Sequence, residues 1–281
     1  MAHPLLQVFL LWDFHVVAGL EAWRRRYGRQ VRSWLAELGE LETLAAFAEL
    51  AHAHPDWAFP TVDPDAQRLV AQDLGHPLLA NAARVGNDAE LGPAGTFLFI
   101  TGSNMSGKTT FLRSLGTNVV LAQAGAPVAA RELTLPPLAL GTSIAVEDSL
   151  EEGVSFFLAE LKRLKSVVDL AVQPPPGRRV LYLLDEVLRG TNSAERRVAV
   201  ARILDRLLAT GALGAITTHD LEVLAEGDLA VAAVAIHFRE TLETDALGVT
   251  RMSFDYHARP GLAPTTNALR LLAAVGLGDA E

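Results

Sequence analysis

Residues 96–109 read Thr-Phe-Leu-Phe-Ile-Thr-Gly-Ser-Asn-Met-Ser-Gly-Lys-Thr, and this stretch decides how the rest of the chain is interpreted. The run 96–100 is short and apolar, which is typical of a buried strand. The next residues match the pattern Gly, four residues, then Gly-Lys-Ser/Thr, from Gly102 to Lys108 and Thr109. A helical pattern follows over 108–124. The order predicts a strand, a glycine-rich loop and a helix.

Phosphate binding is the chemistry that this loop predicts. Consecutive backbone N–H groups and the N-terminus of the following helix hold phosphate oxygens. Lys108 is expected to reach the β- and γ-phosphates as a compact charge, and the Thr109 hydroxyl to ligate Mg²⁺. A chance glycine-rich turn is the alternative, against which the flanking strand and helix argue. The predicted nucleotide-binding residues of the loop are Gly102, Ser103, Asn104, Met105, Ser106, Gly107, Lys108, Thr109 and Thr110.

A second apolar run, 180–184, ends at Asp185 and Glu186. Carboxylates at the C-terminal end of a buried strand are suited to hold Mg²⁺ and to activate a water molecule. Asp185 is expected to hold the metal, and Glu186 to act as the general base. An acidic strand end is a weak signal alone, because strands often reach solvent there. Downstream of a phosphate loop, the two motifs support each other.

A histidine follows the predicted strand 214–217, within Thr217-Thr218-His219-Asp220. A histidine in that place can donate a hydrogen bond to a γ-phosphate. Strand-end histidines are more often structural, but the position of His219 after the other two motifs favours a catalytic role. The predicted catalytic residues are therefore Lys108, Glu186 and His219.

The organisation of the whole chain is read from its hydrophobic periodicity. Strands and helices alternate from about residue 93, which predicts an α/β fold with a mostly parallel sheet covered by helices on both faces. Residues 1–60 are expected to form a helical segment ahead of an α/β domain over 61–281, because prolines and aspartates over 55–64 break the pattern. Further strands are expected at 138–146, 180–184, 214–217, 230–238 and 249–256, and further helices at 154–172, 194–209, 221–225 and 265–275.

Composition limits the function classes. The chain has 281 residues, half of them hydrophobic, and no cysteine, which excludes disulfides and thiolate metal sites and is consistent with a cytoplasmic protein. The 33 acidic residues outnumber the 24 basic ones, so wrapping nucleic acid is not expected to be the main function. The apolar stretch 5–20 is too short and too polar to predict a membrane span.

Three segments, TGSNMSGKTTFLRSLG, LLDEVLRGTNSAERR and TTHDLEVL, occur in this order and resemble the ATPase domain of the MutS DNA mismatch-repair family, within the ABC class of P-loop ATPases. EDSLEEGVSFFLAELKRL resembles the signature segment of that family, and SFDYHARPG its last strands. The resemblance covers about residues 69–277. It implies a P-loop NTPase fold, ATP and Mg²⁺ as bound groups, and hydrolysis of ATP to ADP and phosphate. Residues 1–60 resemble the preceding helical lever less closely.

The same resemblance implies further roles and partners. Ser155 would contact the γ-phosphate of ATP bound to a second subunit, so a homodimer with sandwiched nucleotide is expected. Asn104 and His219 would line the γ-phosphate side, and His237 would pack near the adenine. DNA is an expected partner through the dimer, through further domains or through another protein.

Departures from the family pattern leave an alternative open. Ser103 stands where the repair proteins usually have proline, and Val154-Ser155-Phe156 replaces an Arg-Ser-Thr run. These differences indicate a side branch of the family. The alternative is another ABC-class head, or an ATP-binding interaction module without direct mismatch recognition. A transporter head would usually carry Leu-Ser-Gly-Gly-Gln, which does not occur in this sequence.

Overall fold

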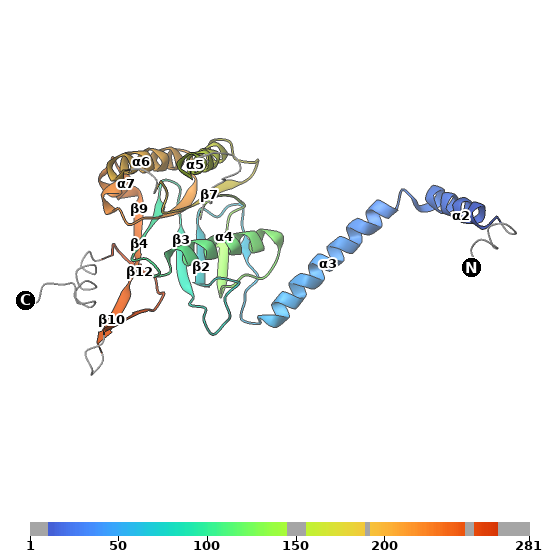
Figure 1. Cartoon of the computed structure of the whole chain (residues 1–281), viewed down its shortest axis with the longest axis horizontal. Helices are drawn as coiled ribbons and strands as arrows, with labels where there is room; N and C mark the ends of the chain where they lie inside the picture. The colour runs from blue at the N-terminus through green and yellow to red at the C-terminus, as the bar shows by residue number, and fades with distance from the viewer. Residues whose placement is uncertain (1–10, 145–155, 189–191, 245–249, 264–281) are drawn as a thin grey trace, which may run out of the picture. The chain divides into compact units, whose positions relative to one another are not determined.

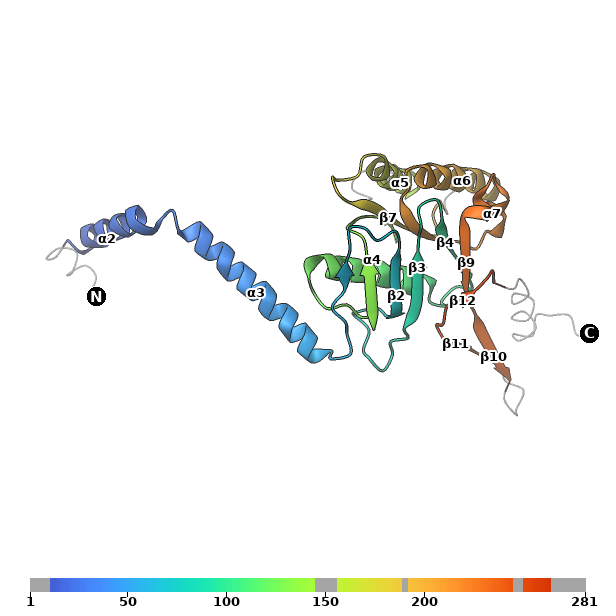
Figure 2. The same cartoon turned by 180° about the vertical axis from the view of Figure 1, so that it is seen from behind.

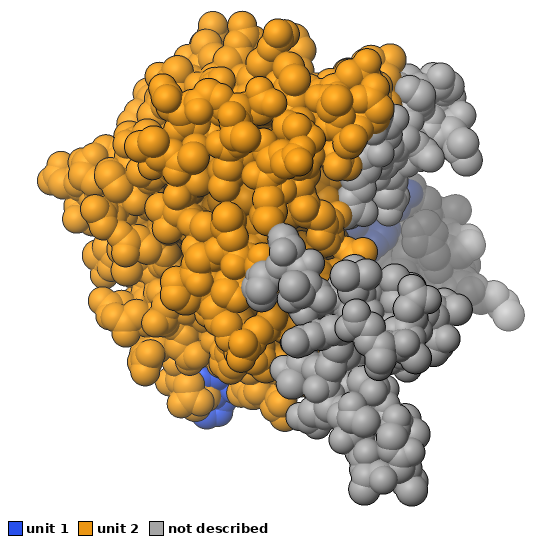
Figure 3. Space-filling view, turned by 90° about the vertical axis from the view of Figure 1, so that its left-hand side faces the viewer, with its two compact units in different colours: residues 1–54 blue, residues 55–281 orange. Residues whose placement is uncertain are grey.

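The computed structural model describes residues 11–144, 156–188, 192–244 and 250–263. The chain divides into two units, Met1–His54 and Pro55–Glu281, which Figure 3 colours separately. The second unit combines helices and strands, so the predicted α/β class is confirmed. In the part of the chain that the structure describes, no helix is both long enough and apolar enough to cross a membrane.

In its described residues, 11–54, the first unit contains two helices, α2 (Trp12–Tyr27) and α3 (Val31–Ala53) (Figure 1). Three aromatic rings join the end of α2 to the start of α3: Tyr27 lies 6.2 Å from Trp23 and 5.9 Å from Trp34, measured between ring centroids. Neither helix contains a buried residue. The two helices therefore contact each other through the aromatic rings where α2 ends and α3 begins.

A six-stranded sheet with the order β12-β9-β4-β8-β7-β6 forms the framework of the second unit. Five strands run parallel, and the edge strand β12 runs antiparallel to β9. Parallel strands end at the same edge, so the loops that follow β4, β7 and β8 meet there. The strands are β4 (Phe97–Gly102), β6 (Leu138–Ser143), β7 (Arg179–Asp185), β8 (Leu213–Thr217), β9 (Ala233–Phe238) and β12 (Arg259–Pro260).

Helices cover both faces of this sheet (Figures 1 and 2). Helix α4 (Lys108–Ala124) lies on one face, and α5 (Phe156–Val172) and α6 (Ser193–Ala209) lie on the other. Successive side chains of a strand point to opposite faces. Leu98 and Ile100 accordingly pack with α4, whereas Phe97 and Phe99 pack with α5 and α6. Two apolar cores result, one on each face.

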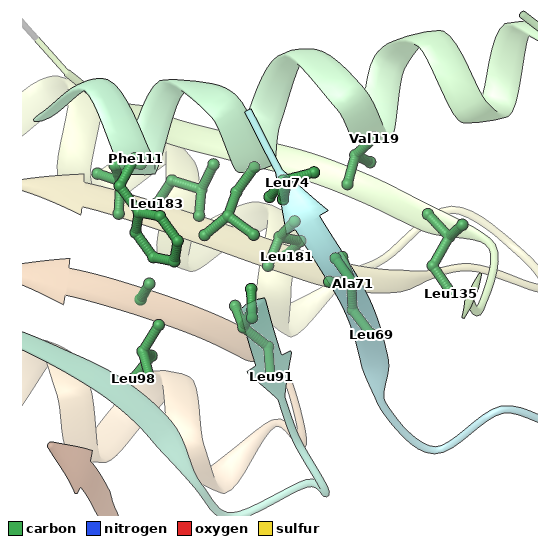
Figure 4. Packing of buried hydrophobic residues seen from close by; sticks show 14 of the residues in the cluster. Leu69, Ala71, Leu74, Leu91, Leu98, Phe111, Val119, Leu135, Leu181 and Leu183 are labelled. Atoms are coloured by element: carbon green, nitrogen blue, oxygen red, sulfur yellow. The ribbon is translucent and has the colours of Figure 1, made fainter. Parts of the chain in front are cut away.

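A second sheet shares the α4 core. Its order is β1-β5-β2-β3, with β1 (Thr61–Val62), β2 (Leu69–Leu74), β3 (Asn87–Leu91) and β5 (Glu132–Leu135). Leu69 and Ala71 of β2 pack with Leu181 and Leu183 of β7 and with Phe111 of α4 in one cluster (Figure 4). The sequence did not predict these four strands, since they are short and β3 (Asn-Asp-Ala-Glu-Leu) is largely polar.

The last described elements are η2 (Leu221–Ala225), α7 (Leu229–Ala232) and an antiparallel hairpin of β10 (Glu240–Thr244) and β11 (Thr250–Phe254). The expectation of a strand from residue 230 is wrong at its start, where α7 stands. Leu229 is 1% exposed and Val231 is 88% exposed. A strand would place both on one face, whereas a helical turn separates them. The helix expected at 265–275 lies outside the described residues.

Candidate functional site

The loop between β4 and α4 has a backbone that requires glycine at both ends. Gly102 has φ +136°, and a Cβ there would lie 2.3 Å from the carbonyl oxygen of Phe238. Gly107 has φ +109°, and a Cβ there would lie 3.2 Å from Cδ1 of Tyr256. Any other residue would be strained at both positions and would collide at the first. The two glycines of the motif thus allow the loop to curl tightly before α4 begins.

Polar side chains of the loop hold its shape. The hydroxyl of Ser106 donates to the carbonyl oxygen of Ser103 at 2.8 Å. The hydroxyl of Ser103, in the place where the repair proteins usually have proline, donates to Oε2 of the buried Glu240 at 2.5 Å. The loop is therefore fixed both within itself and to the strand β10.

Lys108, the first residue after the loop, is a buried cation. Its side chain is only 4% exposed. Nζ donates to the carbonyl oxygens of Gly102 at 2.9 Å and Ser103 at 2.8 Å, and lies 3.6 Å from Oε1 of Glu186. Lys108 is also the first residue of α4, and the N-terminus of a helix favours an anion through its free N–H groups and its dipole. This geometry suits a phosphate group.

Oxygen donors meet beside the lysine. The Thr109 hydroxyl lies 2.9 Å and 3.1 Å from the two carboxylate oxygens of Asp185, and the Thr217 hydroxyl donates to Asp185 Oδ1 at 2.6 Å. Hydroxyl and carboxylate oxygens are the ligands that Mg²⁺ prefers, usually with water and phosphate oxygens completing the octahedron. The described residues contain no group of three or more His, Cys, Asp or Glu that could hold a metal alone. Thr109 and Asp185 thus suit a cation whose remaining ligands are oxygens of a phosphate group and of water.

The carboxylate of Glu186 and the imidazole of His219 are in contact. Glu186 is 12% exposed, and its Oε1 lies 2.9 Å from Nε2 of His219. The same nitrogen lies 2.9 Å from Oδ1 of Asn104. The backbone N–H of Glu186 is held by Thr217, through the carbonyl oxygen at 3.1 Å and the hydroxyl at 3.0 Å. The Glu186 carboxylate therefore stands between a lysine and a histidine.

A cavity of about 640 Å³ opens over the loop. This volume is within the range of sites for small organic ligands. Its lining includes a polar set of residues and an apolar, partly aromatic set, which we call the polar end and the apolar end. The polar end contains Asn104, Lys108, Thr109, Thr110 and Glu186, and the apolar end contains Leu74, Leu79, Val85, Phe238 and Tyr256.

Tyr256 and Asn87 are residues of this cavity that the sequence reasoning did not select. Tyr256 has φ +57° and is 44% exposed. The Asn87 side chain donates to the Tyr256 carbonyl oxygen at 3.0 Å and accepts from the N–H of Ala258 at 2.7 Å. A bidentate amide therefore fixes the turn that carries the ring. Tyr256 lies in the segment SFDYHARPG, which the sequence analysis matched to the last strands of the family without assigning a role to its tyrosine.

The same turn contains an ion pair. The guanidinium of Arg259 donates to both carboxylate oxygens of Asp255, from Nη1 at 3.1 Å and from Nη2. These hydrogen bonds lower the pKa of Asp255 from 3.8 to about 2. The carboxylate also accepts from the N–H of His257 at 3.1 Å. At neutral pH the Asp255 carboxylate therefore stabilises the turn that contains Tyr256.

The candidate residues fall into three groups. The loop residues meet Asp185, Glu186 and His219 at the C-terminal edge of the sheet. His237 lies on β9, where its Nδ1 is 3.1 Å from the Gly261 carbonyl oxygen, and it is not among the residues that line the cavity. Ser155 lies outside the described residues.

This is an α/β domain in which a glycine-rich loop, a buried lysine and the strand-end carboxylate of Glu186 line one cavity. A family model described as MutS domain V matches residues 98–278. The chain therefore belongs to the MutS family.

Curated relatives agree with this assignment. The chain is 29% identical over 273 residues to DNA mismatch repair protein MutS 2 of Halobacterium salinarum, covering 95% of this chain and 30% of the relative. It is 33% identical to endonuclease MutS2 of Thermus thermophilus (67% and 28%) and 34% identical to DNA mismatch repair protein MutS of Cereibacter sphaeroides (70% and 23%). The chain thus spans 23–30% of the length of these relatives.

Proposed function

We propose that this chain is an ATP-binding and ATP-hydrolysing switch domain, an ABC-class P-loop ATPase of the MutS family. The observation that carries the proposal is the arrangement at the polar end of the cavity. There Glu186 lies 3.6 Å from the Lys108 ammonium and 2.9 Å from His219. The oxygen donors Thr109 and Asp185 lie beside the same lysine.

Each residue has a role in the proposed hydrolysis. Glu186 accepts a proton from water while the water oxygen forms a bond to the γ-phosphorus. The bond from that phosphorus to the bridging oxygen breaks, and its electron pair leaves with ADP. Lys108 and His219 stabilise the charge on the phosphate oxygens. Thr109 and Asp185 would hold Mg²⁺, which would neutralise further charge on the phosphates.

The apolar end of the cavity is proposed to hold the base. An exposed aromatic ring offers a stacking surface for adenine, and Tyr256 presents such a ring at this end. We therefore assign the stacking contact to Tyr256. His237, expected from the resemblance to pack near the adenine, lines no part of the cavity.

Dimerisation and a role in DNA repair or DNA metabolism complete the proposal. Relatives are named as mismatch-repair proteins and as endonucleases. The chain itself carries a net charge of −9, which disfavours direct binding to DNA phosphates. We propose that ATP brings two copies together through Ser155, and that DNA is engaged through the dimer or through other polypeptide segments.

A combined hydrolysis and sedimentation experiment tests this function. Purified chain with ATP and Mg²⁺ should release phosphate, and chelation of Mg²⁺ should stop the release. A non-hydrolysable ATP analogue should shift the sedimentation coefficient to that of a dimer, and duplex DNA can be added in a second run. Absence of ATP binding would overturn the proposal, and binding without turnover would leave an ATP-binding interaction module.

The contact across the dimer has its own test. The Lys108→Ala chain, which should not bind ATP, is mixed with the Ser155→Ala chain, which should bind ATP but lacks the contact to its partner. If Ser155 acts across the interface, mixed dimers recover turnover, because the first variant supplies its serine to the ATP of the second. If Ser155 only caps its helix, mixing changes nothing.

A further inference from the structure

Glu160 of α5 is a buried carboxylate that contacts the segment following the general base. Its side chain is 4% exposed. Oε1 accepts a hydrogen bond from the backbone N–H of Leu188 at 2.7 Å. Glu160 does not line the cavity, so any effect on chemistry must act through the polypeptide between Glu186 and Leu188.

That short segment has a backbone of high conformational energy. Glu186 has φ +45° and Leu188 has φ +60°. Residues with a Cβ rarely occupy this left-handed region, at a cost of about 1–2 kcal/mol each, and persist there only when the surroundings hold them. Val187 and Leu188 are both buried, within 4% exposure, and pack in the same core as Leu164 of α5.

Backbone hydrogen bonds hold the segment at both of its ends. On one side, the N–H of Glu186 donates to Thr217 of β8. On the other side, the N–H of Leu188 donates to Glu160. Since Leu188 is fully buried, loss of this acceptor would leave its N–H without the partner that Glu160 supplies, and a buried unsatisfied donor costs about 1–3 kcal/mol. The segment would then relax and turn the Glu186 side chain.

We propose that Glu160 is a positioning residue for the general base. Through Leu188 it keeps the Glu186 carboxylate between Lys108 and His219. This inference rests on the proposed ATPase function, and it assigns to α5 a role in catalysis that needs no contact with ATP. The role depends on an acceptor oxygen at the correct distance from Leu188.

Three variants separate this role from a merely structural one. Glu160→Leu removes the acceptor, Glu160→Asp retracts it by one methylene, and Glu160→Gln keeps an oxygen in place. We expect kcat to fall by about 10–100-fold in the Leu and Asp variants, because small misplacements of a catalytic group cost that much. We expect Gln to keep most of the activity. KM and the affinity for a non-hydrolysable ATP analogue should stay unchanged in all three.

The control is Val167→Ala on the same helix. Val167 is buried and packs against Gly141 of β6. It should lower the thermal stability and leave kcat unchanged. If Glu160→Leu does not fold, the Asp and Gln variants decide, since both keep an acceptor oxygen and only Gln keeps it at the reach of Glu.

The outcomes distinguish this inference from the proposed function. No turnover by the unaltered chain would overturn the ATPase function itself. If the unaltered chain turns over ATP and the Asp and Leu variants keep its kcat, the role of Glu160 alone is overturned. An equal loss in Gln and Asp would also overturn it, because an acceptor oxygen would then not suffice. A faster amide exchange at Leu188 in the Asp variant, but not in Gln, would support it.

Discussion

The two ends of the cavity are built by different physical means. At the polar end, charged groups are buried and fixed by several hydrogen bonds, and Lys108 and Glu186 are only 4% and 12% exposed. At the apolar end, Tyr256 is 44% exposed and its position depends on a turn held by Asn87. Electrostatic interactions strengthen with burial, whereas a stacking surface works while half exposed. Changes at the polar end should therefore have larger effects.

The largest effect is expected from Lys108→Ala. The variant removes the buried cation of the polar end, and breaking a buried charge interaction costs about 3–5 kcal/mol, which corresponds to about two to four orders of magnitude in ATP affinity. Binding is measured by titration calorimetry, with circular dichroism as the folding control. Lys108→Arg should bind ATP poorly too, because its planar fork does not replace a point charge. Unchanged affinity in Lys108→Ala would contradict the assignment of the loop.

Glu186→Gln should separate chemistry from binding within the polar end. The amide still contacts water but cannot accept its proton, and general-base catalysis contributes about 10²–10⁴ to the rate. Turnover should fall by that factor while ATP stays bound, as measured by single-turnover kinetics and by analogue binding. A variant with near-normal turnover would show that the base lies elsewhere.

Tyr256→Ala tests the apolar end. Stacking of a base on an aromatic ring contributes about 1–3 kcal/mol, so the Kd for ATP should rise about 5–150-fold. The kcat at saturating ATP should not change, because the contact proposed for the ring is with the base and not with the phosphate that reacts. Tyr256→Phe is the matched control and should bind like the unaltered chain. Equal losses in the Ala and Phe variants would point to the hydroxyl instead of the ring.

The smallest effect is expected from Asp255→Asn, in the turn beside Tyr256. The pKa of Asp255 is lowered to about 2 in the folded state from 3.8, so the carboxylate stabilises the fold above pH 4. This contribution is lost as the pH falls from 4 toward 2. Since exposed ion pairs contribute about 0–1 kcal/mol, Tm at pH 7 should fall by no more than about 4 °C. The difference in Tm should close on acidification, and a constant difference would reject the ion pair as its cause.

Local sequence patterns predicted the polar end well. The helix over 108–124 was expected with the bounds that α4 has, and the strands before the loop, before Asp185 and before His219 all occur. These features depend on neighbours in sequence: glycines permit the backbone of the loop, and apolar runs form buried strands. Parallel pairing then brings the strand ends to one edge without further information.

The apolar end and the contacts that hold the segment after Glu186 depended on long-range packing. Asn87 and Tyr256 are 169 positions apart, and Glu160 and Leu188 are 28 apart. Neither pair shares a motif, because a side-chain amide or carboxylate reaches a backbone group only after the second sheet, α5 and β11 have packed. Periodicity reports which face of an element is apolar, but not which distant segment will cover it. The sequence alone therefore predicted the elements of the polar end, while the apolar end and the contact between Glu160 and Leu188 required the folded arrangement.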